Sequence, residues 1–232
     1  MAGEDFKTGY YYYNNFQNKF RGMEEQNQFK LEIDGERKPP FNVLPHGGES
    51  IYYGVLFDSV ESDSHFDYLL NEISWKNDEA VMFGKHIITA RKVAWFGDRN
   101  FDYTYSGRTR TALEWTPRLK AMKDLIENKT GARYNSCLLN LYADGDQGMG
   151  WHHDDEGGLG PNSNIASISF GAVRRFDFRH KQSKEKVSVM LEHGSLLVMR
   201  GTTQACWQHQ IPKSKKITTP RINLTFRLMV DQ

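Results

Sequence analysis

Two segments of the chain space their apolar residues with the period of an α-helix. The first covers residues 62–75, and its apolar stripe is formed by Phe66, Leu69, Leu70 and Ile73. These positions follow the i, i+3, i+4, i+7 pattern of one helix face. Ser62 or Asp63 is expected to cap the start of this helix.

The second helical segment covers residues 116–130. Its stripe is formed by Leu119, Met122 and Ile126. Pro117 suits the first turn of a helix and Gly131 suits its C-terminal stop. Both apolar stripes are expected to face the core, because a one-sided stripe is typical of a helix packed on a larger body.

Beyond residue 133 the pattern changes to short runs separated by Gly, Pro, Asn or Asp clusters, which is typical of strands and turns. The predicted strands are 135–142, 165–170, 175–179, 187–191, 195–199 and 222–228. Helices followed by many short strands predict a mainly β fold of the α+β class. We expect the helices to pack on one sheet of an antiparallel sandwich or jelly roll.

Residues 1–50 show neither period. A polar-aromatic patch lies at 10–18, and the later part of this region is interrupted by Pro39-Pro40, Pro45 and Gly47-Gly48. We expect an extended arm, with a loosely packed lid as the alternative. A single domain is expected over residues 51–232, which is within the usual size of one β-barrel or sandwich.

Composition excludes some classes of protein. Hydrophobic residues make up 38% of the chain, enough for a packed core, and the net charge is +1. Attraction to nucleic acid would therefore have to come from local basic patches. No apolar run approaches the ~18–20 residues that a membrane span needs, so we expect no membrane association.

The two cysteines, Cys137 and Cys206, lie in apolar runs. Two cysteines are too few for a disulfide framework, which favours buried thiols in a reducing compartment. The N-terminus lacks the basic-then-apolar pattern of a signal peptide. An intracellular monomer is expected, cytoplasmic in a bacterium and nuclear in a eukaryote.

The segment His152-His153-Asp154 suggests metal chemistry. Residues two apart in a strand share a face, so His152 and Asp154 are expected to point the same way and His153 away. Two histidines and a carboxylate can hold Fe(II) on one face and leave other positions open, with zinc as a competitor. The second histidine would be His209, brought in by the fold. A solvated polar turn is the alternative for this spacing alone.

The C-terminal run 221–227 alternates strictly between polar and apolar residues. Its apolar face is Ile222, Leu224 and Phe226, and its polar face is Arg221, Asn223, Thr225 and Arg227. A half-exposed strand gives the same alternation. Two arginines with few acidic neighbours favour an anion site, because a planar guanidinium matches a carboxylate with two parallel hydrogen bonds.

Asn140 and Tyr142 share one face of the predicted strand 135–142. An amide and a phenol that face inward just before His152 could bind a second acid group. Satisfied polar residues at the rim of a sheet are an equally good interpretation of the spacing.

These motifs together resemble the AlkB family of Fe(II)- and 2-oxoglutarate-dependent nucleic-acid dealkylases. In chain order they are Asn140-Leu141-Tyr142, His152-x-Asp154-Asp155-Glu156, 165–171, 193–199, Trp207-Gln208-His209 and 220–227. The match covers residues 80–229 and is most like the DNA-repair branch that includes the human double-strand-acting homologue.

The resemblance implies a double-stranded β-helix, or jelly roll, with the iron inside one end. It implies that His152, Asp154 and His209 are the metal ligands. The implied 2-oxoglutarate pocket consists of Asn140, Tyr142, Arg221, Asn223 and Arg227, with Arg221 on the distal carboxylate.

The implied reaction consumes 2-oxoglutarate and O2 and yields succinate and CO2, with ascorbate as a reductant in vitro. An N-methyl group on a base such as 1-methyladenine or 3-methylcytosine is hydroxylated, and the product releases formaldehyde. The protein supplies binding, orientation and exclusion of water.

A methyl group on a Watson–Crick edge is reached only when the nucleotide is flipped out of the duplex. The resemblance implies a nucleotide-recognition lid over residues 80–110, in which Tyr105 stacks on the flipped base and Tyr103 lies nearby. Phe83 would wedge into the gap left in the duplex. Glu156 would accept a hydrogen bond from an exocyclic amine.

Phosphate contacts are expected from basic residues that flank the proposed site. They are Arg91 and Lys92, then Arg174, Arg175, Arg179, Lys181, Lys184 and Lys186, and finally Lys213, Lys215 and Lys216. The stretch 181–186 is shorter than the basic loop of the double-strand-acting homologue, which leaves duplex DNA, single-stranded DNA and RNA open as substrates.

These residues leave three functions open. The first is direct-reversal repair of alkylated DNA, and the second is the same chemistry on methylated RNA. The third is a catalytically silent nucleic-acid-binding module, against which the complete ligand set argues. A zinc hydrolase would leave Arg221, Asn223 and Arg227 unexplained.

Overall fold

The computed structural model describes residues 37–82, 85–105, 108–154, 158–160 and 162–230. Within these ranges, the side chains of residues 80–87 and 102–110 are not described. Helix α2 (Ser59–Glu72) is capped by Asp58, whose carboxylate accepts from the Glu61 amide while the Glu61 carboxylate accepts from the Asp58 amide. The predicted cap at Ser62 or Asp63 is therefore wrong. A reciprocal capping box lies upstream of both and starts the helix at Ser59.

Helix α3 (Pro117–Thr130) confirms the prediction for the second segment. The Thr116 hydroxyl accepts from the Leu119 amide at 3.2 Å, and Pro117 occupies the first turn. Gly131 ends the helix with a φ of 70°, a left-handed conformation that glycine adopts without steric cost. Its amide donates to the Glu127 carbonyl.

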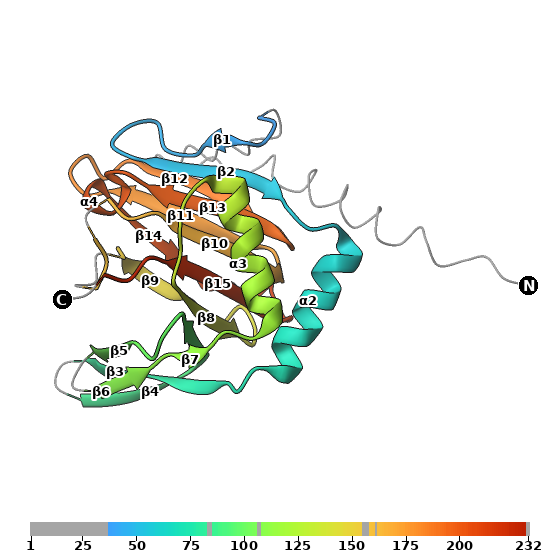
Figure 1. Cartoon of the computed structure of the whole chain (residues 1–232). Coiled ribbons are helices and arrows are strands. Elements are labelled where there is room, and N and C mark those ends of the chain that lie inside the picture. The colour runs from blue at the N-terminus through green and yellow to red at the C-terminus, as the bar shows by residue number, and fades with distance from the viewer. Residues whose placement is uncertain (1–36, 83–84, 106–107, 155–157, 161, 231–232) are drawn as a thin grey trace, which may run out of the picture. The chain divides into compact units, whose positions relative to one another are not determined.

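Most described strands form one large sheet and one small sheet, seen in Figure 1. The large sheet has the order β1 (Phe41–Asn42), β2 (Glu49–Val55), β13 (Ser195–Arg200), β10 (Ile165–Gly171), β15 (Arg221–Arg227), β8 (Ser136–Tyr142), β4 (Lys85–Gly97) and β3 (Lys76–Met82). The small sheet has the order β12 (Lys186–Leu191), β11 (Arg174–His180), β14 (Trp207–Ile211) and β9 (Met149–His152).

Three short strands complete the described architecture. β7 (Leu113–Glu114) runs parallel to β4, whereas the other pairings between named strands are antiparallel. β5 (Asp102–Tyr105) pairs with β6 (Arg108–Thr111) as a separate hairpin, inside the predicted lid. A short helix, α4 (Thr203–Cys206), precedes β14.

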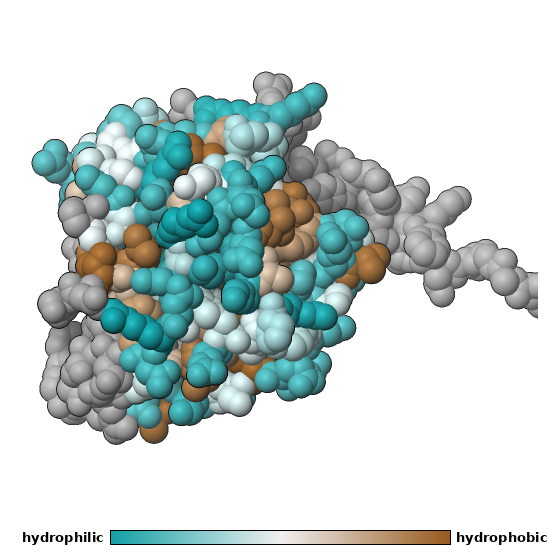
Figure 2. Space-filling view, in the orientation of Figure 1, coloured by the Kyte–Doolittle hydropathy of each residue, from teal (hydrophilic) through white to brown (hydrophobic). Residues whose placement is uncertain are grey.

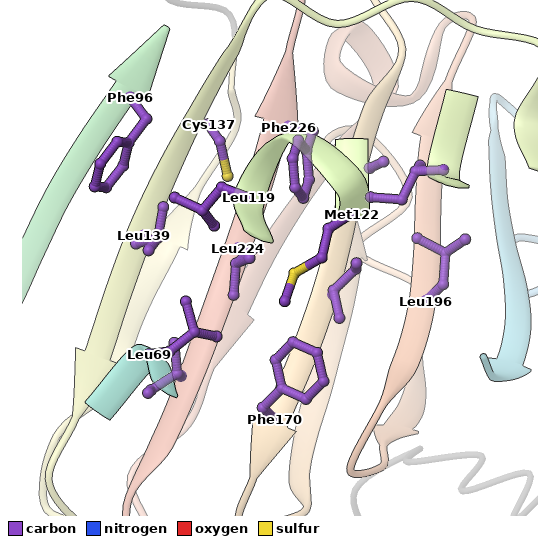
Figure 3. Close-up of a cluster of buried hydrophobic side chains, with 14 of the residues drawn as sticks. Leu69, Phe96, Leu119, Met122, Cys137, Leu139, Phe170, Leu196, Leu224 and Phe226 are labelled. Atoms are coloured by element: carbon purple, nitrogen blue, oxygen red, sulfur yellow. The ribbon is translucent and has the colours of Figure 1, made fainter. Parts of the chain in front are cut away.

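The two helices cover the outer face of the large sheet, as Figure 3 shows. Leu69 of α2 and Leu119, Met122 and Ile126 of α3 are all at most 2% exposed, against strand residues such as Leu224 and Phe226. Isolated helices of this length are marginal in water, so burial of these stripes holds them in place. The outward surface over the helices is mostly hydrophilic (Figure 2).

A second core lies between the two sheets. The large sheet contributes Ile165, Leu197 and Met199, and the small sheet contributes Phe176, Phe178 and Trp207. The prediction of a mainly β jelly roll with helices packed on one sheet is therefore confirmed. Over the described residues, no helix combines the length and the apolar character needed to cross a bilayer.

The six predicted strands are present, with no end shifted by more than one residue. The sequence pattern missed β2, β3, β4, β9 and β14. The predicted boundary at residue 50 falls inside β2, which pairs with β13 in the large sheet. Proline and glycine residues just before β2 concealed where its alternation begins.

Candidate metal centre and cosubstrate pocket

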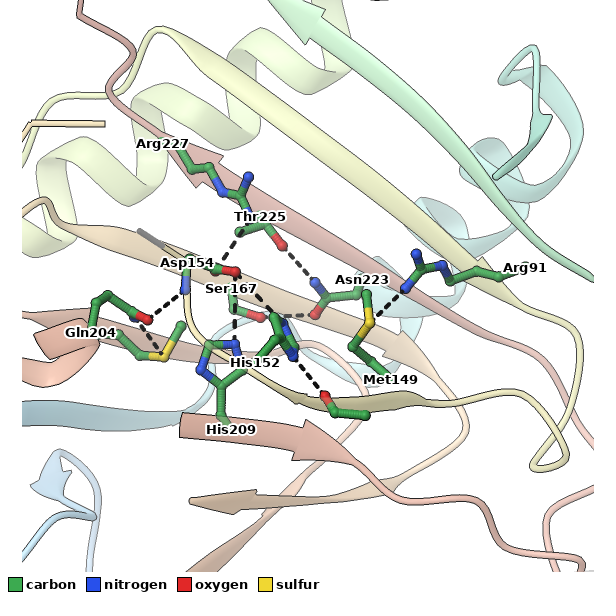
Figure 4. Close-up of polar contacts among 12 residues, drawn as sticks. Arg91, Met149, His152, Asp154, Ser167, Gln204, His209, Asn223, Thr225 and Arg227 are labelled. Carbon is green, nitrogen blue, oxygen red and sulfur yellow. Dashed lines mark hydrogen bonds and ion pairs between the residues drawn. The ribbon is translucent and has the colours of Figure 1, made fainter. Parts of the chain in front are cut away.

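The fold brings His152, Asp154 and His209 together. His152 ends β9 and lies directly opposite His209 on β14, and Asp154 follows β9 by two residues. One ligand atom from each residue lies within 4.8 Å of the other two. Figure 4 shows the three side chains pointing toward one another, and the parity argument predicted a shared direction for His152 and Asp154.

The distances suit a metal held on one face. The Asp154 Oδ1 atom lies 3.6 Å from Nε2 of His152 and 3.9 Å from Nε2 of His209. The Nδ1 atom of His152 lies 2.8 Å from the Gly150 carbonyl, which leaves Nε2 directed at the site. A ring nitrogen held by a main-chain carbonyl is the usual way to orient a metal-binding histidine. Two nitrogens and one oxygen are the donor set that non-haem Fe(II) prefers.

Electrostatics keep the donors in the forms that bind metal. Burial is the largest influence on His209 and lowers the pKa of its imidazole to about 3, so the ring is neutral. Burial alone would raise the pKa of Asp154, but Arg227 and the two histidines outweigh it and lower that pKa to about 2. A neutral imidazole and an ionised carboxylate are both required for ligation.

Arg227 and Gln204 hold the carboxylate ligand from two sides. The guanidinium of Arg227 lies 3.2 Å from Oδ2 of Asp154, which leaves Oδ1 for the histidine side. The main-chain amide of Asp154 donates to Oε1 of Gln204 at 2.8 Å (Figure 4). The sequence pattern did not identify Gln204, because it lies 50 residues away on α4 and only the fold brings it there.

The polar face of β15 continues from the metal centre along the sheet. Asn223 pairs with Asn140 and Arg221 pairs with Tyr142 across β15 and β8, so the predicted pocket residues lie side by side. Asn223 Oδ1 accepts from Ser167 at 2.8 Å and from Arg221 at 2.9 Å. Asn140 and Tyr142 are both buried.

Arg221 is a buried cation that suits an anionic ligand. Its side chain is 1% exposed, and its Nη2 donates to Ser169 at 2.8 Å. Among the residues the structure describes, no carboxylate lies within ion-pairing distance of Arg221, and its Nε has no partner. Burial lowers the pKa of its guanidinium to about 10. A buried charge needs a counter-ion, and the distal carboxylate of a 2-oxo acid has the geometry to provide one.

The predicted nucleic-acid residues are only partly described. Phe83 and Glu156 lie outside the described residues, and Tyr103 and Tyr105 are described only as backbone of β5. Lys215 and Lys216 are exposed in the connection between β14 and β15. Their exposure is compatible with the phosphate contacts that the sequence predicted, which remain a prediction.

Two arginines from the predicted phosphate-contact set lie inside the molecule. Arg91 forms an ion pair with Asp78, places Nη1 3.4 Å from the Met149 sulfur, and has a side chain that is 14% exposed. Arg174 is 1% exposed, so its predicted phosphate contact is wrong. Its parity with Phe176, which faces the core, was the signal in the sequence that indicated this burial.

Comparisons with known proteins agree with this geometry. The sequence model described as the 2OG-Fe(II) oxygenase superfamily matches residues 50–227. The chain is 41% identical over 202 residues to DNA oxidative demethylase ALKBH2 of Mus musculus, covering 82% of this chain and 84% of the relative. The human protein of that name is 42% identical over 200 residues, covering 82% and 77%.

A second group of relatives is similarly close. Human alpha-ketoglutarate-dependent dioxygenase alkB homolog 3 is 37% identical over 209 residues, covering 84% of this chain and 71% of the relative. The solved structure of OsALKBH1 shares the fold, with a TM-score of 0.57 and 16% identity over 79% of this chain and 99% of that chain. The chain thus belongs to the AlkB family of the 2OG-Fe(II) oxygenase superfamily, whose members depend on Fe(II) and 2-oxoglutarate.

Proposed function

We propose that this protein removes methyl groups oxidatively from N-alkylated bases in DNA, such as 1-methyladenine and 3-methylcytosine, and releases formaldehyde. The observation that carries the proposal is the convergence of His152, Asp154 and His209 within 4.8 Å, beside a row of buried arginines. The relatives named DNA oxidative demethylase, at 41–42% identity over 82% of this chain, supply the class of substrate.

Each part of the site has a role in this reaction. His152, Asp154 and His209 would hold the iron on one face. Arg227 binds Oδ2 of Asp154 and so orients Oδ1 toward the two histidines. Fe(II), with 2-oxoglutarate and O2, supplies the oxidising power that hydroxylates an N-methyl group.

The pocket residues orient the cosubstrate. Arg221 and Tyr142 would take the distal carboxylate of 2-oxoglutarate. Asn140 and Asn223 line the same face of the sheet. The burial of Asn140, Tyr142 and Arg221 excludes water, which strengthens each polar contact to the bound acid.

The DNA-binding part of the proposal rests on the lid and on the connection between β14 and β15. The hairpin β5–β6 carries Tyr103 and Tyr105, and we assign them to the flipped base, with Glu156 at its edge. Phe83, which lies outside the described residues, would fill the gap in the duplex. The exposed Lys215 and Lys216 would contact phosphates without reading sequence. We expect the protein to act as an intracellular monomer.

The test is a formaldehyde assay with purified protein, Fe(II), 2-oxoglutarate and ascorbate. The substrates are oligonucleotides carrying 1-methyladenine as duplex DNA, single-stranded DNA and RNA. Mass spectrometry of each oligonucleotide measures the loss of the methyl group. We expect turnover of DNA, abolished in His152→Ala and retained in the matched neighbour variant His153→Ala.

The three substrates separate the alternatives. Turnover confined to RNA would replace the DNA proposal with the RNA one. Binding of methylated DNA without formaldehyde release, in protein that binds metal and 2-oxoglutarate, would identify a silent binding module instead. An equal loss of activity in both histidine variants would remove the specific role of His152.

A further inference from the structure

Arg174, the first residue of β11, is a charged side chain in the interior with no assigned role. It is 1% exposed, although it belongs to a stretch of the sequence that is rich in basic residues. Burying a guanidinium is costly unless each of its donors is satisfied. Its contacts therefore indicate what the fold uses it for.

The guanidinium of Arg174 binds main-chain carbonyls from two segments. Its Nη1 donates to the Asp144 carbonyl at 3.2 Å, and its Nη2 donates to the carbonyls of Gln147 and Pro212, both at 2.9 Å. Asp144 and Gln147 lie in the turn 143–148, which leads from β8 into β9. Pro212 directly follows β14.

These two segments lead to the metal centre. The turn 143–148 begins after Tyr142 and precedes the strand that ends at His152, while Pro212 follows the strand that carries His209. One planar side chain thus holds together the supports of both histidines. The fork of donors in a guanidinium makes this possible, because a lysine ammonium offers no fixed planar set.

Arg174 also lies against the proposed 2-oxoglutarate pocket. Its guanidinium carbon is 5.9 Å from the centre of the Tyr142 ring, and that of Arg221 is 5.5 Å from the same ring. Among the described residues, neither guanidinium has a carboxylate within 4.0 Å. The guanidinium of Arg91 also lies 5.9 Å from this ring, but Asp78 pairs with it. Arg174 and Arg221 therefore raise the positive potential around this buried phenol, which favours an anion.

We propose that Arg174 is a positioning residue of the 2-oxoglutarate pocket, which fixes Tyr142 and the two histidine strands and adds a second buried positive charge that favours a dicarboxylate. This rests on the assignment of Arg221 and Tyr142 to the distal carboxylate. It predicts that Arg174 governs discrimination between 2-oxo acids with and without that carboxylate.

The test measures binding by calorimetry to protein loaded with Mn(II), with 2-oxoglutarate and with 2-oxobutyrate, which lacks the distal carboxylate. Arg174→Met should weaken 2-oxoglutarate binding about ten- to a hundredfold, the loss expected for charge-assisted contacts, and change 2-oxobutyrate binding far less. Arg133→Met removes an arginine whose side chain is 81% exposed, and it should leave both affinities unchanged.

A second variant separates charge and geometry from simple stability. Arg174→Lys keeps the positive charge and loses the fork, so it should recover part of the 2-oxoglutarate affinity. Thermal unfolding of each variant shows whether the compared samples are folded. If Arg174→Met does not fold, the wild type and Arg174→Lys are compared instead, and a reduced preference for the dicarboxylate is expected.

The result that overturns the proposal is a folded variant that is less stable but has the wild-type preference for 2-oxoglutarate over 2-oxobutyrate. Arg174 would then be a structural clamp alone. Since the assay contains no nucleic acid, that result would leave the proposed demethylation of DNA intact. Conversely, a protein inactive on DNA would still give a valid measurement of acid binding.

Discussion

Strand β15 has two faces that are both largely hidden from solvent and differ in chemistry. Toward the helices it presents Ile222, Leu224 and Phe226, each at 0% exposure. On the other face it presents Arg221 and Arg227, at 1% and 8%. The apolar face gains stability from burial, whereas the polar face loses solvation that only a partner of opposite charge restores. This contrast indicates that burial of polar groups at this site serves binding rather than folding.

The largest effect on the fold should come from the apolar face. Leu224→Ala leaves a cavity beneath α2 and α3 and should lower the free energy of unfolding by about 2–5 kcal/mol. Urea denaturation measures it. The folded fraction should bind 2-oxoglutarate with unchanged affinity, and a clear loss of that affinity would show that the two faces are not independent.

The polar face should show the reverse pattern. Arg221→Met removes a buried cation and should weaken 2-oxoglutarate binding about a hundredfold, the loss of roughly two charge-assisted hydrogen bonds. The free energy of unfolding without the cosubstrate should stay the same or rise, because removing a buried charge also removes its desolvation cost. Calorimetry and urea denaturation on the same sample test both parts. Wild-type affinity would exclude Arg221 from the pocket.

A smaller effect is expected next to the metal centre. Gln204→Leu leaves the Asp154 amide without its acceptor and should weaken Mn(II) binding about tenfold, as outer-shell changes usually do. Gln182→Leu, at an exposed turn position, is the matched control and should bind Mn(II) normally. Equal affinity in all three proteins would mean that Arg227 alone is sufficient to position the carboxylate.

The smallest effect should come from the surface. Removing Lys215 and Lys216 together should lower affinity for DNA and reduce the salt slope by roughly 0.9 for each phosphate that is no longer neutralised. The control is Lys129→Ala, at an exposed position in the last turn of α3. Fluorescence anisotropy over a range of salt measures the slope. An unchanged slope would show that Lys215 and Lys216 do not contact the phosphate backbone.

Local patterns were sufficient for much of this molecule. The caps of α3 and the alternation of β15 depend on neighbours in sequence, and both were predicted correctly. The same parity placed His152 and Asp154 on one face. The capping box of Asp58 and Glu61 was also local, and it was overlooked because the apolar stripe begins later.

The remainder depends on contacts between distant segments. β2 and β4 are irregular in pattern, and besides their neighbours β1 and β3 they pair with the distant strands β13 and β8. Gln204 has no local feature that links it to Asp154. Arg174 was assigned to phosphate contacts because it belongs to a basic run that flanks the site. Its parity with Phe176 indicated that it faces the interior, but the carbonyls that satisfy it come from two segments that only the fold brings together.

The position of β9 at the edge of the small sheet affects how fast its main-chain amides exchange with solvent. β9 pairs with β14 across a register shift, so the amides near His152 have few main-chain hydrogen bonds to slow their exchange with solvent. A metal ion held by His152 and His209 would cross-link these two strands. Hydrogen–deuterium exchange over residues 149–154 should therefore slow markedly when Mn(II) is added. The exchange rate of this segment would then report directly on the occupancy of the metal centre.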